Sequence, residues 1–343
     1  MNELYRSKYL KYRQKTLQQS GGELNINGPI HIVYFSNATT NKKIIVLGDV
    51  HKKYKICEDN AIFITKYLES LSKSIKFNFY IETEMPTKYE LLNNKINRFK
   101  YVPADVEEMD AYIADVIDFG ITNYKKIDNI KIHFGDVRHD ITGFETFKNY
   151  TNQFDLLSNI NVLKDDYNLL SHYNSFLDIY HKIVTKIYNF CLTIIENKPE
   201  EEYNKYIFYV PDYFYKSVIK LSNTHPKECF KLLAVLIKIL SIYLDKIYEE
   251  GIFIGINDLD NLRSIYRLGL KCTGAIADFY MISKIIRDTD SNNILYVGDA
   301  HIDNIKIYLQ NIGFTIDTDK YTDDDYLQCI KNIKPFDEFF KIS

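Results

Sequence analysis

Side chains able to do chemistry follow four short apolar runs of the chain: His51, Glu82, Arg138 and His301. A histidine binds metal ions and exchanges protons near neutral pH, and a glutamate does either at lower pH. The guanidinium of an arginine fits a carboxylate, a phosphate or a developing oxyanion. These side-chain types suit hydrolytic chemistry, so we expect the four residues to share one site.

The two histidines close motifs that resemble each other. An apolar run leads into Gly-Asp-Val-His at residues 48–51 and into Gly-Asp-Ala-His at residues 298–301. Glycine lets the chain leave a strand sharply and lets a neighbouring group come close. The repeat predicts two histidines facing one site. Asp49 and Asp299 suit either metal ligation or helix capping, because both roles fit a turn from strand to helix.

Two glutamates compete for one role in this site. Glu82 directly follows the apolar residues 79–81, whereas Glu84 lies two residues further and suits a second ligand or a solvated loop. We therefore favour Glu82. For Arg138, the structural alternative is an ion pair with a nearby aspartate such as Asp136.

The elements that must position these residues alternate between strand and helix. Apolar runs predict strands at residues 43–47, 77–81, 131–134 and 294–297, and helical periodicity marks residues 56–71, 106–119, 273–287 and 302–311. This order predicts an α/β fold, with a mainly parallel sheet flanked by helices. Sites in open parallel sheets form at the carboxyl ends of the strands. We therefore expect all four candidates at one edge.

Four segments organise the chain. Residues 1–28 read as a basic helical arm and linker, and residues 29–143 as the first part of the α/β core, which opens with a β-hairpin at residues 30–47. Residues 144–251 have long helical periodicity and predict a large helical insertion. Residues 252–343 return to the α/β pattern.

The composition excludes several classes of function. Lys plus Arg (43) nearly balances Asp plus Glu (46), so the net charge of −3 provides no field to attract nucleic acid. The apolar stretch at residues 232–244 is too short to cross a bilayer, so we expect no membrane insertion. The first fifteen residues lack the apolar core of a secretory signal.

Cysteine usage points to a reducing compartment. The five cysteines are widely spaced, odd in number and without a CxxC pair, which argues against both a disulfide framework and a cysteine zinc site. Together with the missing signal, this predicts a cytoplasmic protein.

The paired Gly-x-x-His motifs, with Glu82 after the second core strand and Arg138 between them, resemble the TraB/TIKI superfamily, whose distant relatives include ChaN-like and erythromycin-esterase-like proteins. The resemblance implies a hydrolase acting on a peptide or a small ester. TIKI-like members are metal-dependent proteases, which implies a divalent ion (Mn, Co or Zn) held by His51, Glu82 and His301. The esterase-like members imply the same site without an established metal. Aspartate in both motifs is a departure that adds Asp49, Glu84 and Asp299 as further ligand candidates.

The basic arm, the A/T-driven composition and the GDVH, IETE, FGDVR and VGDAH series are also similar to proteins of giant DNA viruses of the mimivirus group. That resemblance implies a viral origin and supplies no activity. It places the chain in the host cytoplasm or in the virion.

Two alternatives stay open beside the hydrolase. Residues 49–51 form the Asp-x-His that opens the two-metal site of calcineurin-like phosphoesterases, although the later motifs of that family are missing. The other alternative is a catalytically inactive virion or host-interaction protein that uses its tyrosine-rich helical segment as the working surface. The oligomeric state is left open by the sequence.

Overall fold

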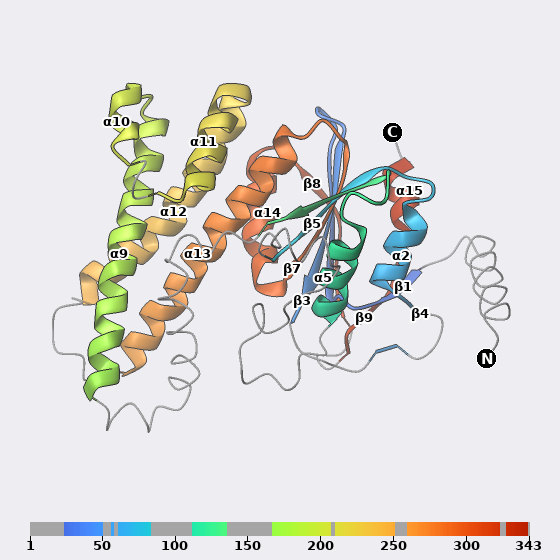
Figure 1. Ribbon diagram of the computed structural model, residues 1–343, viewed down its shortest axis with the longest axis horizontal. Helices are drawn as coiled ribbons and strands as arrows, with labels where there is room; N and C mark the ends of the chain where they lie inside the picture. The colour runs from blue at the N-terminus through green and yellow to red at the C-terminus, as the bar shows by residue number, and fades with distance from the viewer. Residues whose placement is uncertain are drawn as a thin grey trace.

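The computed structural model describes residues 24–50, 56–57, 61–83, 112–135, 167–206, 210–250, 259–322 and 327–341. Within these ranges the chain forms a six-stranded sheet, a three-stranded sheet and helices on both faces of the larger sheet (Figure 1). The predicted α/β class is confirmed.

The larger sheet has the strand order β6-β5-β7-β3-β2-β8. Its strands are β2 (His31–Asn37), β3 (Lys42–Asp49), β5 (Phe77–Ile81), β6 (Ile130–Phe134), β7 (Asn292–Gly298) and β8 (Thr315–Tyr321). Strands β6, β5, β7 and β3 run parallel, whereas β2 pairs antiparallel with both β3 and β8. The carboxyl ends of the four parallel strands therefore lie at one edge.

The central strands β3 and β7 carry continuous buried apolar runs because both faces of the sheet are covered there. In β3, Ile44 and Val46 belong to one core cluster, and Ile45 and Leu47 belong to the other. Successive side chains of a strand point to opposite faces. The uninterrupted apolar run is thus the signature of a central strand.

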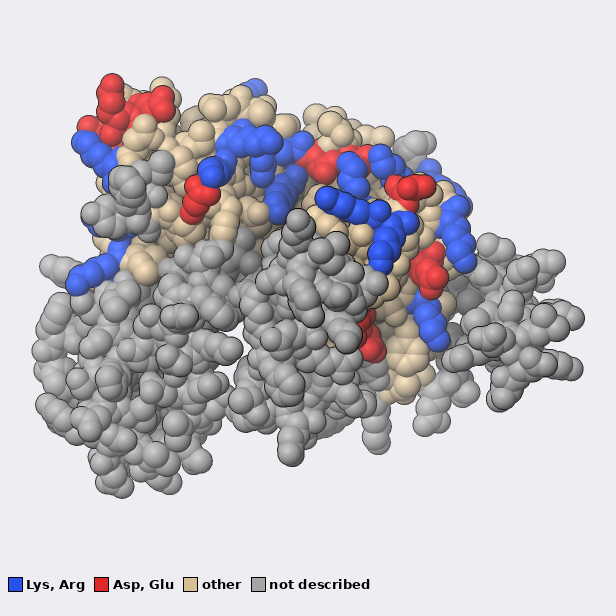
Figure 2. Space-filling model, in the orientation of Figure 1, with Lys and Arg blue, Asp and Glu red and all other residues tan. Residues whose placement is uncertain are grey.

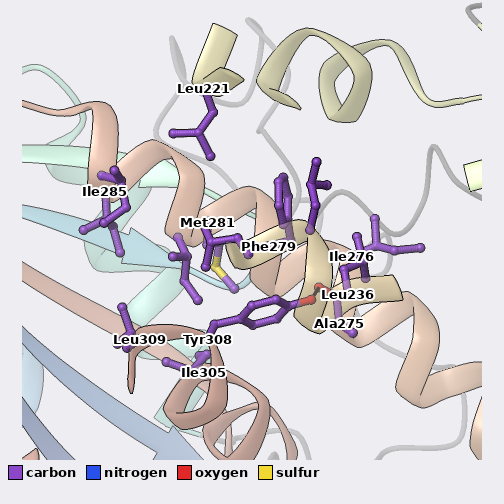
Figure 3. Close-up of a cluster of buried hydrophobic side chains, with 14 of the residues drawn as sticks. Leu221, Leu236, Ala275, Ile276, Phe279, Met281, Ile285, Ile305, Tyr308 and Leu309 are labelled. Atoms are coloured by element: carbon purple, nitrogen blue, oxygen red, sulfur yellow. Dashed lines mark hydrogen bonds between the residues drawn. The ribbon is translucent and has the colours of Figure 1, made fainter. Parts of the chain in front are cut away.

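One face of the sheet is covered by α13 (Leu259–Arg287) and α14 (Ile302–Asn311). Further helices pack outward from α13 on the left of Figure 1: α9 (Tyr167–Ile195), α10 (Glu200–Asn204), α11 (Asp212–Thr224) and α12 (Pro226–Glu250). In Figure 3, Phe279 of α13, Leu236 of α12 and Tyr308 of α14 lie in one apolar cluster. The hydroxyl of Tyr308 donates to the carbonyl of Ala275 at 3.0 Å, which ties α14 to α13.

The opposite face is covered by α2 (Ile64–Leu71), α5 (Tyr112–Asn123) and α15 (Phe336–Lys341). The small sheet lies beside them, with the order β4-β1-β9 formed by β1 (Leu24–Asn27), β4 (Ala61–Phe63) and β9 (Cys329–Ile333). Among the described helices, none combines the length and the apolar composition that crossing a bilayer requires.

The small sheet differs from the sequence-based expectation. Residues 24–27 fall in the predicted linker but form β1, and residues 61–63 fall in a predicted helix but form β4. Helix α13 begins at Leu259 rather than at residue 273. Each strand of the small sheet is so short that its pairing partner, not its own periodicity, decides its conformation.

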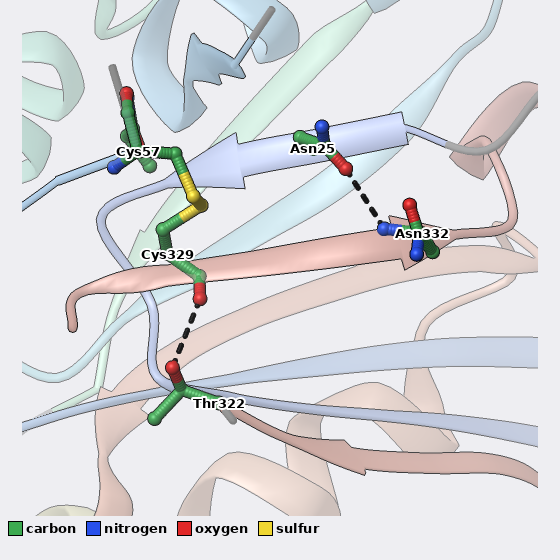
Figure 4. Close-up of a disulfide and its surroundings, with 6 residues drawn as sticks. Asn25, Cys57, Thr322, Cys329 and Asn332 are labelled. Atoms are coloured by element: carbon green, nitrogen blue, oxygen red, sulfur yellow. Dashed lines mark hydrogen bonds between the residues drawn. A yellow bond between two sulfur atoms is a disulfide. The ribbon is translucent and has the colours of Figure 1, made fainter. Parts of the chain in front are cut away.

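A disulfide joins Cys57 to Cys329, and this corrects the expectation that the chain has no disulfide (Figure 4). The two residues are separated by 272 positions, but their Cα atoms lie 5.7 Å apart because Cys329 begins β9 beside β1. Cys191, Cys229 and Cys272 are buried free thiols. Sequence spacing carries no information about a pairing that distant.

Basic side chains are numerous over the upper part of the face shown in Figure 2, with acidic side chains among them. Asp290, for example, pairs with Lys76 at 3.1 Å and with Lys131 at 2.7 Å. Mixed charge of this kind agrees with the nearly neutral composition.

Candidate functional site

Glu82 and His301 meet at the carboxyl edge of the large sheet. Glu82 directly follows β5, and its N–H donates to the carbonyl of Tyr296 in β7 at 3.0 Å. His301 ends the short 3-10 turn η1 (Asp299–His301) that follows β7. Its Nε2 lies 3.0 Å from Oε1 of Glu82, and the N–H of Gly298 donates to Oε2 of the same carboxylate. The fold thus brings together two of the four predicted residues.

This meeting point lies where neighbouring strands send the chain to opposite faces of the sheet. The first described helix after β5 is α5, which packs on one face, and the helix after β7 is α14, which packs on the other. Strands β5 and β7 are direct neighbours. In open α/β sheets a crevice at such a switch point is the usual place for a site.

Asp278 of α13 is the third member of the cluster. Its Oδ1 lies 2.6 Å from Nδ1 of His301, and its Oδ2 accepts a hydrogen bond from the side chain of Asn304 at 3.1 Å. Nδ1 of the imidazole therefore contacts the Asp278 carboxylate, and Asn304 fixes the position of that carboxylate. Such a partner fixes both the ring orientation and the tautomer of a histidine.

A glycine in α13 makes room for this arrangement. A Cβ atom placed on Gly274 would lie 3.3 Å from Cε1 of His301, which is tighter than ordinary contact. Glycine inside a helix costs roughly 0.5–1 kcal/mol relative to alanine. The close approach of the ring to the helix backbone accounts for its use here.

The three side chains are almost fully withdrawn from water, with exposed fractions of 8% for His301, 2% for Glu82 and 0% for Asp278. Burial alone would lower the pKa of His301, but Asp278 and Glu82 outweigh it and raise that pKa well above its ordinary value. Burial raises the pKa of Asp278, against the opposing effect of His301. A protonated imidazole has no lone pair for a metal ion, so a cation can bind Nε2 only after that nitrogen loses its proton.

Asp49 occupies the neighbouring strand end but belongs to another network. It is buried, and its carboxylate accepts hydrogen bonds from the hydroxyl of Tyr296 at 3.0 Å and from the side chain of Gln328 at 2.5 Å. It also accepts the N–H of Val50 at 2.7 Å. These donors hold the end of β3 against β7 and against the start of β9.

Asp299, its counterpart in the second motif, binds His31. Oδ1 of Asp299 lies 2.9 Å from Nδ1 of His31, whose Nε2 lies 2.7 Å from Asp319. Lys306 completes the group by pairing with Asp319 at 2.6 Å. Burial would lower the pKa of His31, but these two aspartates raise it. The N-cap of η1 is Gly298 without a side-chain hydrogen bond, so Asp299 is not a helix cap.

His51, Glu84 and Arg138 lie outside the described residues, so their roles stay predictions. Asp278 was missed by sequence reasoning because a residue inside a helix is placed by packing rather than by a strand end. One signal was present: a carboxylate stands alone in the apolar run of residues 275–279.

Within the ranges that the structure describes, no three His, Cys, Asp or Glu side chains form a cluster that could hold a metal ion. Glu82 and His301 supply two donors that face each other, while Asp278 is turned to the far nitrogen of the ring. A metal site here requires a further ligand, for which His51 is the sequence-based candidate.

Comparison of the chain with protein-family models, with curated proteins and with solved structures finds no match. The resemblance to the TraB/TIKI superfamily therefore remains an expectation, and the function is argued from the site itself.

Proposed function

We propose that this chain is a hydrolase that cleaves a peptide or a carboxylic ester at the carboxyl ends of β5 and β7. The observation that carries the proposal is the contact of 3.0 Å between Nε2 of His301 and Oε1 of Glu82, backed by Asp278 on the other ring nitrogen. The Gly-x-x-His motifs and their resemblance to the TraB/TIKI superfamily support the reaction class.

The side-chain types of Glu82 and His301 suit a divalent cation such as Mn²⁺, Co²⁺ or Zn²⁺, which would replace the proton on Nε2. A buried imidazole whose far nitrogen contacts a carboxylate is the usual environment of a metal-bound histidine. Glu82 and His301 would hold the ion, with His51 as the expected third ligand. When bound, the ion would lower the pKa of a coordinated water so that hydroxide forms near neutral pH.

The chain's own residues prepare this site. Asp278 holds Nδ1 of His301, so that Nε2 is directed at Glu82. The backbone N–H of Gly298 holds Oε2 of Glu82, which leaves Oε1 directed at the ring. Arg138, the fourth predicted residue, would stabilise the oxyanion that forms during cleavage.

An inactive scaffold is the second candidate, and one observation favours it. Both nitrogens of His301 already contact carboxylates of the chain itself. Buried ionic groups of this kind also occur as structural elements without catalysis. The cluster would then only fix α13 and η1 against the sheet.

The phosphoesterase alternative gains no support from Asp49. That family would need its carboxylate on a metal, whereas this one accepts hydrogen bonds from Tyr296, Gln328 and the N–H of Val50. We therefore place the reaction at Glu82 and His301.

Hydrolysis of a panel of peptides and aryl esters, with and without added Mn²⁺, Co²⁺ or Zn²⁺, tests the proposal. The wild type is expected to cleave at least one class, and Glu82→Gln is expected to lose at least 100-fold in kcat/KM. Asp303→Asn is the matched control, because it removes an exposed carboxylate of α14 close to the same edge of the sheet. Equal rates for the wild type and Glu82→Gln would overturn the assignment.

A further inference from the structure

The disulfide is joined to the candidate site by a short series of described contacts. Gln328 precedes Cys329 directly and donates to the carboxylate of Asp49. The same carboxylate accepts the hydroxyl of Tyr296 at 3.0 Å, and the carbonyl of Tyr296 accepts the N–H of Glu82 at 3.0 Å. The disulfide, the peptide bond between Gln328 and Cys329, and three hydrogen bonds thus connect Cys57 to the backbone of Glu82.

Cys57 itself is held at one further point. The side chain of Asn27 accepts the N–H of Cys57 at 3.0 Å and donates to its carbonyl at 3.3 Å. Asn27 is the last residue of β1, which pairs with β9. The disulfide is therefore the covalent link at a junction that is otherwise held by hydrogen bonds.

Residues around Cys329 fix Gln328 in turn. The hydroxyl of Thr322 donates to the carbonyl of Cys329 at 3.1 Å, as Figure 4 shows, and the N–H of Gly28 donates to the carbonyl of Gln328 at 3.1 Å. Gly28 has a φ of +124°, a conformation that other residues rarely adopt. The position of the Gln328 amide thus depends on the junction between the two sheets.

We propose that the Cys57–Cys329 disulfide is a redox-controlled clamp on the hydrolase site: the oxidised chain holds Glu82 in place, and the reduced chain binds the cation more weakly. The inference rests on the proposed function, because it assigns a regulation to that same site. Breaking the bond leaves the start of β9 and residue 57 joined only through the hydrogen bonds of Asn27 and the pairing of β1 with β9. Gln328, Asp49 and Tyr296 are then less well ordered before the cation binds. Ordering them on binding costs free energy, so the cation affinity falls.

The chemistry is ordinary thiol–disulfide exchange. One cysteine thiolate attacks a low-molecular-weight disulfide and releases one small thiolate. The second cysteine thiolate then attacks the mixed disulfide and releases the other, which yields the protein disulfide and two small thiols. Two protons leave the cysteines and two electrons pass to the oxidant. Cys57 is 8% exposed and Cys329 is 1% exposed, so Cys57 is the more accessible of the two to a small thiol.

The first measurement is cation affinity in the two redox states. The oxidised wild type is titrated with Mn²⁺, Co²⁺ and Zn²⁺, and so are the wild type after reduction by a water-soluble phosphine and desalting and the double variant Cys57→Ser/Cys329→Ser. Reduction leaves two thiols and a phosphine oxide whose oxygen comes from water. We expect affinity at least 10-fold lower in both altered forms, and recovery after reoxidation. Phosphine treatment of the double variant is the control, and it should change nothing.

The second measurement does not depend on metal. Hydrogen exchange at the amides of Cys57, Gly28 and Glu82 should become at least 10-fold faster on reduction, because each donates a hydrogen bond within the clamp. Unchanged exchange overturns the clamp, and faster exchange with unchanged affinity overturns its control of the site. If the oxidised protein binds no cation at all, the proposed metal function fails. The exchange data alone then decide whether the clamp exists.

Discussion

Nε2 of His301 and Oε1 of Glu82 lie 3.0 Å apart at the ends of adjacent strands β7 and β5, although the chain reaches them from regions far apart in sequence. This contact defines the site, because each group is also fixed from behind: the ring by Asp278 and the carboxylate by the N–H of Gly298. Two groups held in this way face each other without rearrangement, which is the property a binding or catalytic centre needs.

Asp278 is expected to act through His301 rather than on the substrate. Asp278→Asn keeps the shape of the side chain but removes the negative charge next to Nδ1 of His301, so the cation affinity should fall about 10- to 100-fold. Isothermal titration calorimetry measures the change. Asp303→Asn, an exposed aspartate on α14, is the control and should bind as the wild type does. Unaltered affinity in Asp278→Asn would show that the contact with His301 serves stability alone.

The buried side chain of His133 should make the free energy of unfolding fall in mild acid. Burial and then Lys284 lower its pKa to about 4, whereas the unfolded chain protonates near about 6.5. The unfolded state therefore binds the proton more readily between these values, so the stabilising contribution is complete above pH 6.5 and is lost as the pH falls towards 4.

The ring of His133 stacks on Tyr80 with centroids 4.5 Å apart, and a phenyl ring keeps that stack. Between pH 7.5 and pH 5, urea unfolding of His133→Phe should show a loss smaller by roughly 1–2 kcal/mol than in the wild type. Equal losses in the two proteins would contradict the assignment.

The disulfide should contribute to stability as well as to the site. It closes a loop between residues separated by 272 positions, and cross-links over long loops restrict the unfolded chain most strongly. Cys57→Ser/Cys329→Ser is expected to lower the free energy of unfolding by about 2–5 kcal/mol. Denaturant unfolding under non-reducing conditions measures this loss, with Cys272→Ser, which affects a free thiol, as a comparison. A double variant as stable as the oxidised wild type would mean that the bond does not form in solution.

Replacing Gly48 by alanine should destabilise the fold, because neighbouring side chains leave little room for a Cβ atom. A Cβ atom there would lie 2.5 Å from Cδ1 of Ile302 and 3.1 Å from Cβ of His31. Gly48→Ala should therefore lower the free energy of unfolding by about 1–3 kcal/mol. Ile302→Val removes the nearest atom, so the double variant should lose less than the sum of the two single changes in a double-mutant cycle. If the losses of the two single variants add in the double variant, the contact with Ile302 is not the cause of the destabilisation.

Sequence reasoning predicted that Glu82 and His301 lie at one edge of the sheet, because strand ends are visible as apolar runs that stop at a polar residue and parallel strands end at one edge. It treated Asp49 and Asp299 as equivalent because their motifs look alike. The structure separates them, since Asp299 meets His31 of β2 and Asp49 meets Gln328, next to β9. His31 lies on an antiparallel strand and Gln328 lies next to the small sheet. The local sequence pattern around the two motifs predicts neither neighbour.

Other parts of the fold depended on contacts between distant segments. The strands of the small sheet are short, and their identity follows from pairing of β1 with β4 and β9. The disulfide follows from that same pairing. Asp278 depends on the rotation of α13 about its axis, which the packing of α14 and the close approach at Gly274 determine.

Isothermal titration calorimetry of the wild type, of Glu82→Gln and of the control Asp303→Asn measures whether Glu82 and His301 form a cation site. We expect one site for Mn²⁺, Co²⁺ or Zn²⁺ in the wild type and in Asp303→Asn, and at least 100-fold weaker binding in Glu82→Gln, with all three proteins equally folded by circular dichroism. Absence of binding in the wild type, or equal binding in Glu82→Gln, would contradict this expectation.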